Sequence, residues 1–175
     1  MNPDITATEL RQLIRTRQWT TPTSGSASGY LQANLVMLPS REAFNFLLFC
    51  VRNPKPCPIL DVLEPGQTEP IIAPGADLRT DLPRYKIFEN GEYKTDVQDV
   101  SDYFDSDMVS FMLGCSFSFE NAMLAAGLPI RNMEENKNVS MYVTNKACLS
   151  AGPFSAQLVV TMRPMTPEQA VRAVQ

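Results

Sequence analysis

Residues 108–120, MVSFMLGCSFSFE, indicate the fold of this chain most clearly. Residues 108–113 form an apolar run of strand length, and the mostly small residues over 114–118 predict a turn after it. A helix over about 119–126 is expected next, because Gly127 and a proline two residues later end helices. A strand that leads into a helix through a short turn is typical of α/β proteins.

Three further helices are predicted from capping signals. A capping-box pattern begins at Thr6 and indicates a helix over 7–18, and Ser40 is expected to cap a helix over 41–52. Thr166 begins a last helix with a proline at its first position. We expect the core-facing stripe of the second helix to consist of Phe44, Leu47, Leu48 and Val51.

The remaining apolar runs predict strands. Apart from the run already described, they cover 30–38, 59–63, 140–144 and 158–162. Asn90-Gly91 joins short runs over 85–89 and 92–94 and predicts a tight hairpin, because both residues tolerate positive φ angles. Alternating strands and helices favour an α/β fold with a mixed sheet flanked by helices, in which residues 64–104 form a smaller hairpin-bearing α+β lobe.

Composition excludes several classes of function. The chain has 175 residues, of which 44% are hydrophobic and 19% charged, as is typical of a globular protein. Its net charge of −4 provides no overall positive field, so neither nucleic acid nor an anionic membrane is an expected partner. Because it contains no histidine, it cannot supply a Ser-His-Asp triad, a Cys-His pair or a histidine-ligated zinc site. We predict neither a metal nor a cofactor.

The cysteines and the apolar runs indicate the cellular compartment. The spacing of the four cysteines matches neither paired metal-binding motifs nor a dense disulfide framework, so free thiols are expected. The polar N-terminal segment lacks the apolar core of a signal peptide, and the longest apolar run, over 43–51, is too short to cross a bilayer. These features predict a cytoplasmic protein without a membrane span.

The turn over 114–118 is the main candidate for chemistry. Backbone N–H groups at a helix N-terminus attract anions and can stabilise the thiolate of Cys115, which would then act as a nucleophile or proton acceptor. We assign Cys115 and Ser116 as catalytic candidates, and Ser118 as a residue that binds a substrate carboxylate. In the alternative interpretation, Ser118 caps the helix and Cys115 is a small buried hydrophobic residue.

Basic side chains provide a second set of candidates. Arg79 and Arg84 lie in a polar loop with Asp77 and Asp81. The two guanidinium groups can hold a dicarboxylate through bidentate hydrogen bonds, or they can pair with the aspartates at the surface. Lys55 follows a proline and precedes another, so this stiff loop either presents the lysine to a substrate or serves only as a rigid connection.

Five phrases of the sequence, in this order, resemble the D-glutamate cyclase family, which also contains bacterial proteins named as hydro-lyases. They are GYLQANL at 29–35, RNPKPCP at 52–58, PGADLRTDLP at 74–83, GCSFSFE at 114–120 and MRP at 162–164. The resemblance runs from about residue 21 to residue 175. Asn34, in the first phrase, is a further substrate-binding candidate.

The resemblance implies a carbon–oxygen lyase and, for the cyclase itself, the interconversion of D-glutamate with 5-oxo-D-proline and water. Family members usually continue beyond the position of Gln175, so residues 1–175 are expected to form the N-terminal α/β portion of a longer chain. We therefore expect a hydro-lyase that acts on a small amino-dicarboxylic acid. A non-catalytic sensor or carrier of small acids is the alternative, and assembly into a homo-oligomer is left open.

Overall fold

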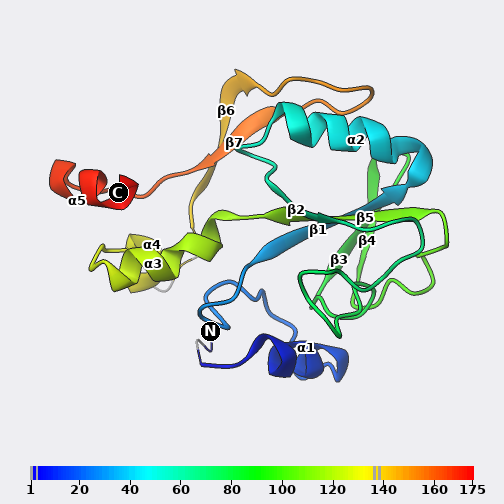
Figure 1. Ribbon diagram of the computed structural model, residues 1–175, viewed down its shortest axis with the longest axis horizontal. Helices are drawn as coiled ribbons and strands as arrows, with labels where there is room; N and C mark the ends of the chain where they lie inside the picture. Colours follow the sequence, from blue (N-terminus) through cyan, green and yellow to red (C-terminus); the bar gives the residue numbers. More distant parts are fainter. Residues whose placement is uncertain (1, 3, 136, 138) are drawn as a thin grey trace.

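The computed structural model describes residues 2, 4–135, 137 and 139–175 (Figure 1). Its helices are α1 (Ala7–Arg15), α2 (Ser40–Arg52), the 3-10 helix η1 (Ser116–Phe119), α3 (Glu120–Ala125), α4 (Arg131–Glu134) and α5 (Pro167–Val174). Its strands are β1 (Ala33–Pro39), β2 (Ile59–Val62), β3 (Tyr85–Glu89), β4 (Glu92–Val97), β5 (Met108–Gly114), β6 (Met141–Ala147) and β7 (Gln157–Thr161). The predicted combination of helices and strands is confirmed.

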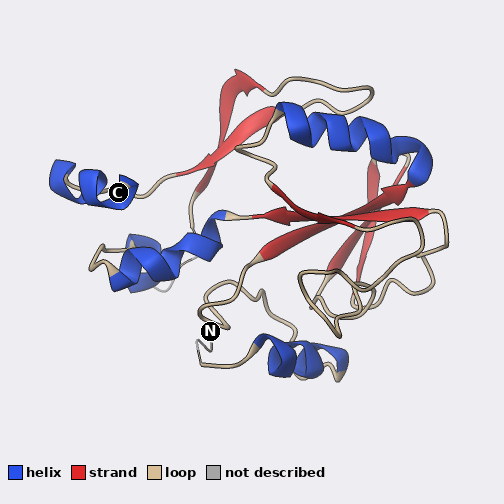
Figure 2. Cartoon of the chain, in the orientation of Figure 1, coloured by secondary structure: helices blue, strands red, loops and turns tan. Residues whose placement is uncertain are grey.

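A three-stranded sheet in the order β1-β5-β2 forms the centre of the molecule, and both of its pairings are antiparallel (Figure 2). β1 and β5 pair along their whole length, from Ala33 opposite Gly114 to Pro39 opposite Met108. α2 covers one face of this sheet, while α1 and the β3–β4 hairpin lie on the other side (Figure 1). Because successive residues of a strand point to opposite faces, β1 and β5 contribute side chains both to the face under α2 and to the opposite face.

The main hydrophobic core lies between α2 and the sheet. Its buried members are Leu38, Phe46, Phe49, Cys50, Val109, Phe111 and Ala151. The rings of Phe46 and Phe111 meet edge to face, with their centroids 4.9 Å apart. Aromatic pairs of this geometry add to the stabilisation that comes from burial of apolar surface.

The predicted core stripe of α2 is only partly right. Leu47 and Leu48 pack at the margin of the core, but Phe44 and Val51 are 71% and 62% exposed. α2 is apolar on more than one side, so contact with β1 and β5, rather than helical spacing, decides which side is buried. The predicted cap at Ser40 is also wrong, because Ser40 is the first helical residue and its hydroxyl hydrogen-bonds to Asp107.

The two hairpins form separate two-stranded sheets. Asn90 and Gly91 have φ angles of 51° and 82° in the β3–β4 turn, which confirms the predicted hairpin. β6 and β7 pair antiparallel, and most of their side chains are exposed. The capping box at Thr166 is present at the start of α5, whereas the short α4 was not predicted. No helix in the described part of the chain is both long and apolar enough to span a membrane.

Candidate functional site

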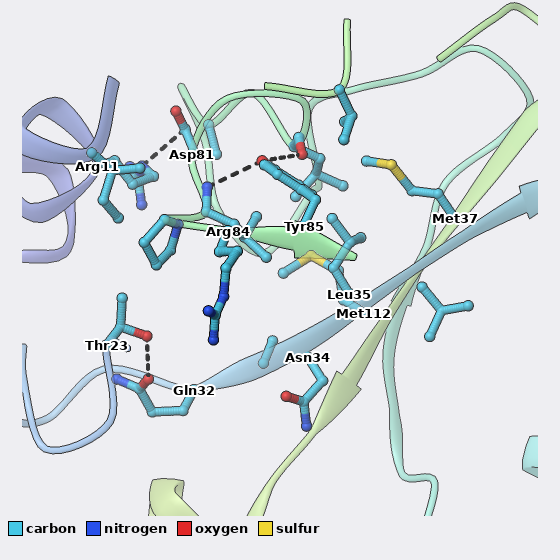
Figure 3. A pocket seen from close by; sticks show the side chains of 18 of the residues that line it. Arg11, Thr23, Gln32, Asn34, Leu35, Met37, Asp81, Arg84, Tyr85 and Met112 are labelled. Carbon is cyan, nitrogen blue, oxygen red and sulfur yellow. Dashed lines mark hydrogen bonds and ion pairs between the residues drawn. The ribbon is translucent and has the colours of Figure 1, made fainter. Parts of the chain in front are cut away.

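An open cleft of about 1040 Å³ lies beside the central sheet, on the side away from α2 (Figure 3). α1, the loop that precedes β1, the strands β1 and β5, and the segment through β3 all contribute to its walls. Leu35 and Met37 of β1 and Met112 of β5 line its apolar part. Alternation along each strand explains this lining, because Leu38 and Phe111 are buried instead in the α2 core.

Polar side chains gather at the end of the cleft near Thr23 (Figure 3). Arg84, which directly precedes β3, extends into the cleft toward Gln32 and Asn34. Its Nη1 atom lies 3.4 Å from Oδ2 of Asp96, and 60% of its side chain is exposed. Because a guanidinium group carries five N–H donors, one ion pair leaves others that can bind a carboxylate.

Gln32 links this polar end to the turn after β5. Its side-chain oxygen accepts a hydrogen bond from Thr23 Oγ1 at 3.3 Å, and its Nε2 donates to the carbonyl of Ser26 at 3.1 Å. Its backbone N–H donates to Ser118 Oγ at 3.0 Å, and Ser118 Oγ donates back to the Gln32 carbonyl at 3.3 Å. Ser118 therefore holds the start of β1 to the turn, and neither η1 nor α3 has a side-chain cap.

Asp81 connects α1 to the wall of the cleft. Only 2% of its side chain is exposed, and the carboxylate accepts hydrogen bonds from Arg15 and from the N–H of Asp77, the latter at 2.8 Å. Arg11 Nε lies 3.7 Å from the same carboxylate and lines the cleft. Arg11 was not among the predicted site residues, although its spacing of four residues from Arg15 on a helix indicates that both share one face.

Cys115 lines the cleft at the N-cap position of η1. Burial raises the pKa of its thiol, and this effect outweighs the N–H groups of Phe117 and Ser118, which lower the pKa. The expected stabilisation of the thiolate is therefore not found, and the thiol is neutral near pH 7. Its Sγ lies 3.5 Å from the Gln32 carbonyl, to which the S–H donates.

Ser116, the second catalytic candidate, points to a buried ion pair. Its Oγ lies 3.4 Å from Nη2 of Arg163, and the same nitrogen donates to Oε1 of Glu120 at 2.5 Å. Arg163 was not predicted to contact this turn, because Ser116 and Arg163 lie 47 residues apart in the chain.

The structure separates the other predicted site residues. Arg79 donates from Nε and Nη2 to the carboxylate of Asp77, at 2.9 and 2.6 Å, so these two residues form the alternative ion pair. Among the described residues that line the cleft, Arg84 and Asn34 are present, but Arg79 and Lys55 are not. Lys55 is exposed in the loop after α2.

The four cysteines are free thiols, as predicted. Cys50 is buried, and Cys57 and Cys148 pack against the same core under α2, whereas Cys115 borders the cleft. Burial raises the pKa of Cys50 to about 11. Within the described ranges, no group of cysteine, aspartate and glutamate side chains is arranged to hold a metal ion.

Comparison with known proteins extends these observations. A sequence model of the D-glutamate cyclase family, described as "D-glutamate cyclase", matches residues 109–175, which include β5 and the Cys115 turn. A protein of Syntrophobacter fumaroxidans is 59% identical over 95% of this chain and 64% of its own length. Proteins of Geobacillus kaustophilus and Stutzerimonas stutzeri are 55% and 54% identical, each over 98% of this chain and 65% of its own length.

The names of these three relatives all begin with "Putative hydro-lyase". The chain spans slightly less than two thirds of each of them. Residues 109–175 therefore resemble the D-glutamate cyclase family, and nearly the whole chain resembles relatives named as hydro-lyases.

Proposed function

We propose that the chain contributes to a hydro-lyase that acts on a small amino-dicarboxylic acid, with D-glutamate and 5-oxo-D-proline as the reacting pair. The observation that carries this proposal is that Arg84 and Cys115 border one cleft. A guanidinium group with unused donors can hold a carboxylate, and a neutral thiol can donate a proton. The match of residues 109–175 to the family model and the names of the relatives support the same class of reaction.

Cyclisation of glutamate requires the amine nitrogen to attack the carbon of the distal carboxyl group. One C–N bond forms and one C–O bond breaks. The ammonium nitrogen loses two protons in total and the departing oxygen gains two, so that it leaves as water and any group that relays a proton is restored. Negative charge develops on the carboxyl oxygen during the attack, and backbone N–H donors near that oxygen lower the barrier. The N–H group of Phe117 lies beside Cys115 and is the donor that we assign to this role, whereas the N–H of Ser118 donates to the Cys115 carbonyl at 3.4 Å.

Cys115 serves in this proposal as a proton donor to the departing oxygen. Its raised pKa favours the protonated thiol over a thiolate nucleophile. Arg84 orients the α-carboxylate of the substrate, with Asn34 beside it. Ser116 and Ser118 hold the turn through Arg163 and Gln32, and so position the reacting groups.

The cleft is larger than a five-carbon acid requires, since ligand sites of about 300 to 1,000 Å³ accommodate drug-sized molecules. We therefore place the substrate at the polar end, between Arg84 and the Cys115 turn. The apolar part around Met37 and Met112 remains outside this assignment.

The test is incubation of the chain with D-glutamate, L-glutamate or 5-oxo-D-proline, followed by chiral chromatography. The Syntrophobacter fumaroxidans relative is assayed in parallel, because it is longer than the chain. Cys115→Ser is expected to lower kcat while the thermal transition is retained, and Cys148→Ser, on the α2 side of the sheet, is the matched control. Absence of interconversion of all three compounds by both proteins would reject the proposed reaction.

A sensor or carrier of small acids is the second candidate. Because the Cys115 thiol is neutral and the chain has no histidine, neither a thiolate nor an imidazole accepts a proton in the cleft near pH 7, which favours binding without turnover. Calorimetry with D-glutamate, combined with the chromatographic assay, distinguishes the two functions. Binding without interconversion, in the chain and in the longer relative, would identify the sensor.

A further inference from the structure

Arg163 and Glu120 form a buried ion pair whose charges take no direct part in the proposed bond-forming and bond-breaking steps. Their side chains are 10% and 5% exposed, and Nη2 of Arg163 lies 2.5 Å from Oε1 of Glu120. Glu120 is the first residue of α3, and Arg163 follows β7, 43 residues later in the chain. The pair therefore joins the segment after β7 to the helix that follows the Cys115 turn.

The surroundings of Arg163 fix its orientation. Nη1 donates to Thr161 Oγ1 at 3.0 Å, and the guanidinium carbon lies 5.0 Å from the centre of the Phe119 ring. Nε is buried and has no hydrogen-bond partner among the described residues. An unpartnered buried donor lowers stability, and a buried ion pair adds little to it when both charges are desolvated. Stability alone is thus a poor explanation for this arrangement.

The same guanidinium also acts on the turn. Its Nη2 atom contacts Ser116 Oγ, one residue after Cys115, at 3.4 Å. Burial is the main cause of the raised pKa of Cys115, and the negative charge of Glu120 raises that pKa further. Arg163 therefore touches the turn directly and also pairs with the carboxylate whose charge acts on the thiol.

We propose that Arg163 is a positioning residue of the cleft, which holds the Cys115 turn through Ser116 and Glu120 and sets the charge beside the thiol. Its importance for turnover rests on the proposed function, whereas its effect on the thiol does not. The charged groups near this thiol are Glu120 of α3 and Arg163 after β7, and Arg84 lines the same cleft. Gln32, just before β1, and Asn34 of β1 are neutral. The other charged residues that line the cleft, among those described, are Arg11, Asp81, Lys86 and Glu89.

The experiment measures the rate at which iodoacetamide alkylates Cys115 as a function of pH, with each cysteine followed separately by mass spectrometry. Arg163→Gln leaves the charge of Glu120 uncompensated, so the pKa of Cys115 rises and alkylation at pH 8 becomes slower. Glu120→Gln removes the negative charge and leaves Arg163 positive, so alkylation becomes faster. We expect changes of about threefold in each direction, which corresponds to half a pKa unit at a pH below the thiol pKa.

A purely structural role predicts a different result. Loss of either partner would then loosen the turn, expose Cys115 and accelerate alkylation in both variants. Acceleration in both variants, or an unchanged rate in both, would overturn the proposal. Arg131→Gln, which breaks the exposed 3.0 Å pair with Glu135 on α4, is the matched control and should leave the Cys115 profile unchanged.

A variant that retains the charge separates folding from electrostatics. Arg163→Lys preserves the positive charge but not the planar fork, so its Cys115 profile should stay close to that of the unmodified chain. If Arg163→Gln does not fold, Arg163→Lys and Glu120→Gln are compared instead, and the proposal requires faster alkylation only in the second. Turnover of D-glutamate is measured separately, so its absence would reject the proposed reaction without affecting the alkylation result.

Discussion

Ser118 and Gln32, which lie 86 residues apart in the sequence, exchange two hydrogen bonds. The Gln32 N–H donates to Ser118 Oγ at 3.0 Å, and the serine hydroxyl donates to the Gln32 carbonyl at 3.3 Å. The backbone of Gln32 lies just before β1, at the point where that strand enters the central sheet. One hydroxyl group thus replaces the strand-to-strand hydrogen bonds that β5 no longer supplies beyond Gly114.

Ser118→Ala is expected to lower the free energy of unfolding by about 1 to 2 kcal/mol, because it leaves a half-buried backbone N–H without its partner. Urea denaturation followed by circular dichroism measures this loss. Ser28→Ala, at an exposed position in the loop before β1, is the control and should change stability by less than about 0.5 kcal/mol. Equal stability of the two variants would show that water replaces the serine hydroxyl.

Substitution of Arg84, but not of Arg79, is expected to weaken the binding of small dicarboxylates. Arg84 extends into the cleft, whereas Arg79 binds the Asp77 carboxylate through two nitrogens. Calorimetry with D-glutamate should show about tenfold weaker binding for Arg84→Gln, which corresponds to loss of one charge-assisted hydrogen bond. If Arg79→Gln weakened binding to the same extent, the result would favour the prediction that Arg79 and Arg84 hold the dicarboxylate together.

Asp77 is expected to make stability depend on pH below about pH 4. Hydrogen bonds from the Arg79 side chain are the main cause that lowers the pKa of Asp77 below its ordinary value of 3.8. A lowered pKa in the folded state means that the ionised carboxylate stabilises the fold above the unfolded-state pKa. This contribution is lost as the pH falls through the lower, folded-state pKa.

The measurement compares the free energies of unfolding of the unmodified chain and Asp77→Asn between pH 7 and pH 2.5. The unmodified chain should be more stable at pH 7, and the difference should shrink below pH 4. In an Arg79→Gln background the same comparison should show a smaller dependence on pH, since the main cause of the lowered Asp77 pKa is absent. A difference that stays constant down to pH 2.5 would contradict this prediction.

Replacement of a phenylalanine by alanine should lower the free energy of unfolding much more on the buried side of α2 than on its exposed side. Phe46 is buried against Phe111, whereas Phe44 is 71% exposed. Phe46→Ala is expected to lower the free energy of unfolding by about 3 to 4 kcal/mol, the range found for buried phenylalanines. Phe44→Ala should change it by less than about 0.5 kcal/mol, as is usual for exposed positions. Thermal unfolding of both variants tests whether Phe46, and not Phe44, belongs to the core. A larger loss of stability for Phe44→Ala than for Phe46→Ala would contradict this assignment.

Features that depend on neighbouring residues could be predicted from the sequence. The capping box joins Thr6 to Glu9 as expected, and Asn90 and Gly91 adopt the positive φ angles of a tight hairpin turn. The strand over 108–113 and the turn after it also lie where predicted. In each case the stabilising contacts are made within a few residues, so the local pattern contains the necessary information.

Features that depend on burial and distant contacts could not be predicted in this way. The sequence of α2 has apolar residues on more than one side, so it does not decide which side is buried. Packing against β1 and β5 buries Phe46 rather than Phe44. The turn was expected to stabilise a Cys115 thiolate through its N–H groups, but burial raises the pKa because loss of water disfavours the charged form.

The cleft likewise contains residues that are far apart in the sequence, so their contacts could not be predicted from local patterns. The sequence by itself determined the polar loop that contains Arg79 and Arg84, and the tertiary structure decided that only Arg84 reaches the cleft. The sequence also determined the small-residue turn after β5, but only folding placed Arg163 beside it to pair with Glu120. The physical reason is that the three-dimensional packing around a charged side chain determines both its ion-pair partner and its degree of burial. Spacing along the chain gives neither of these.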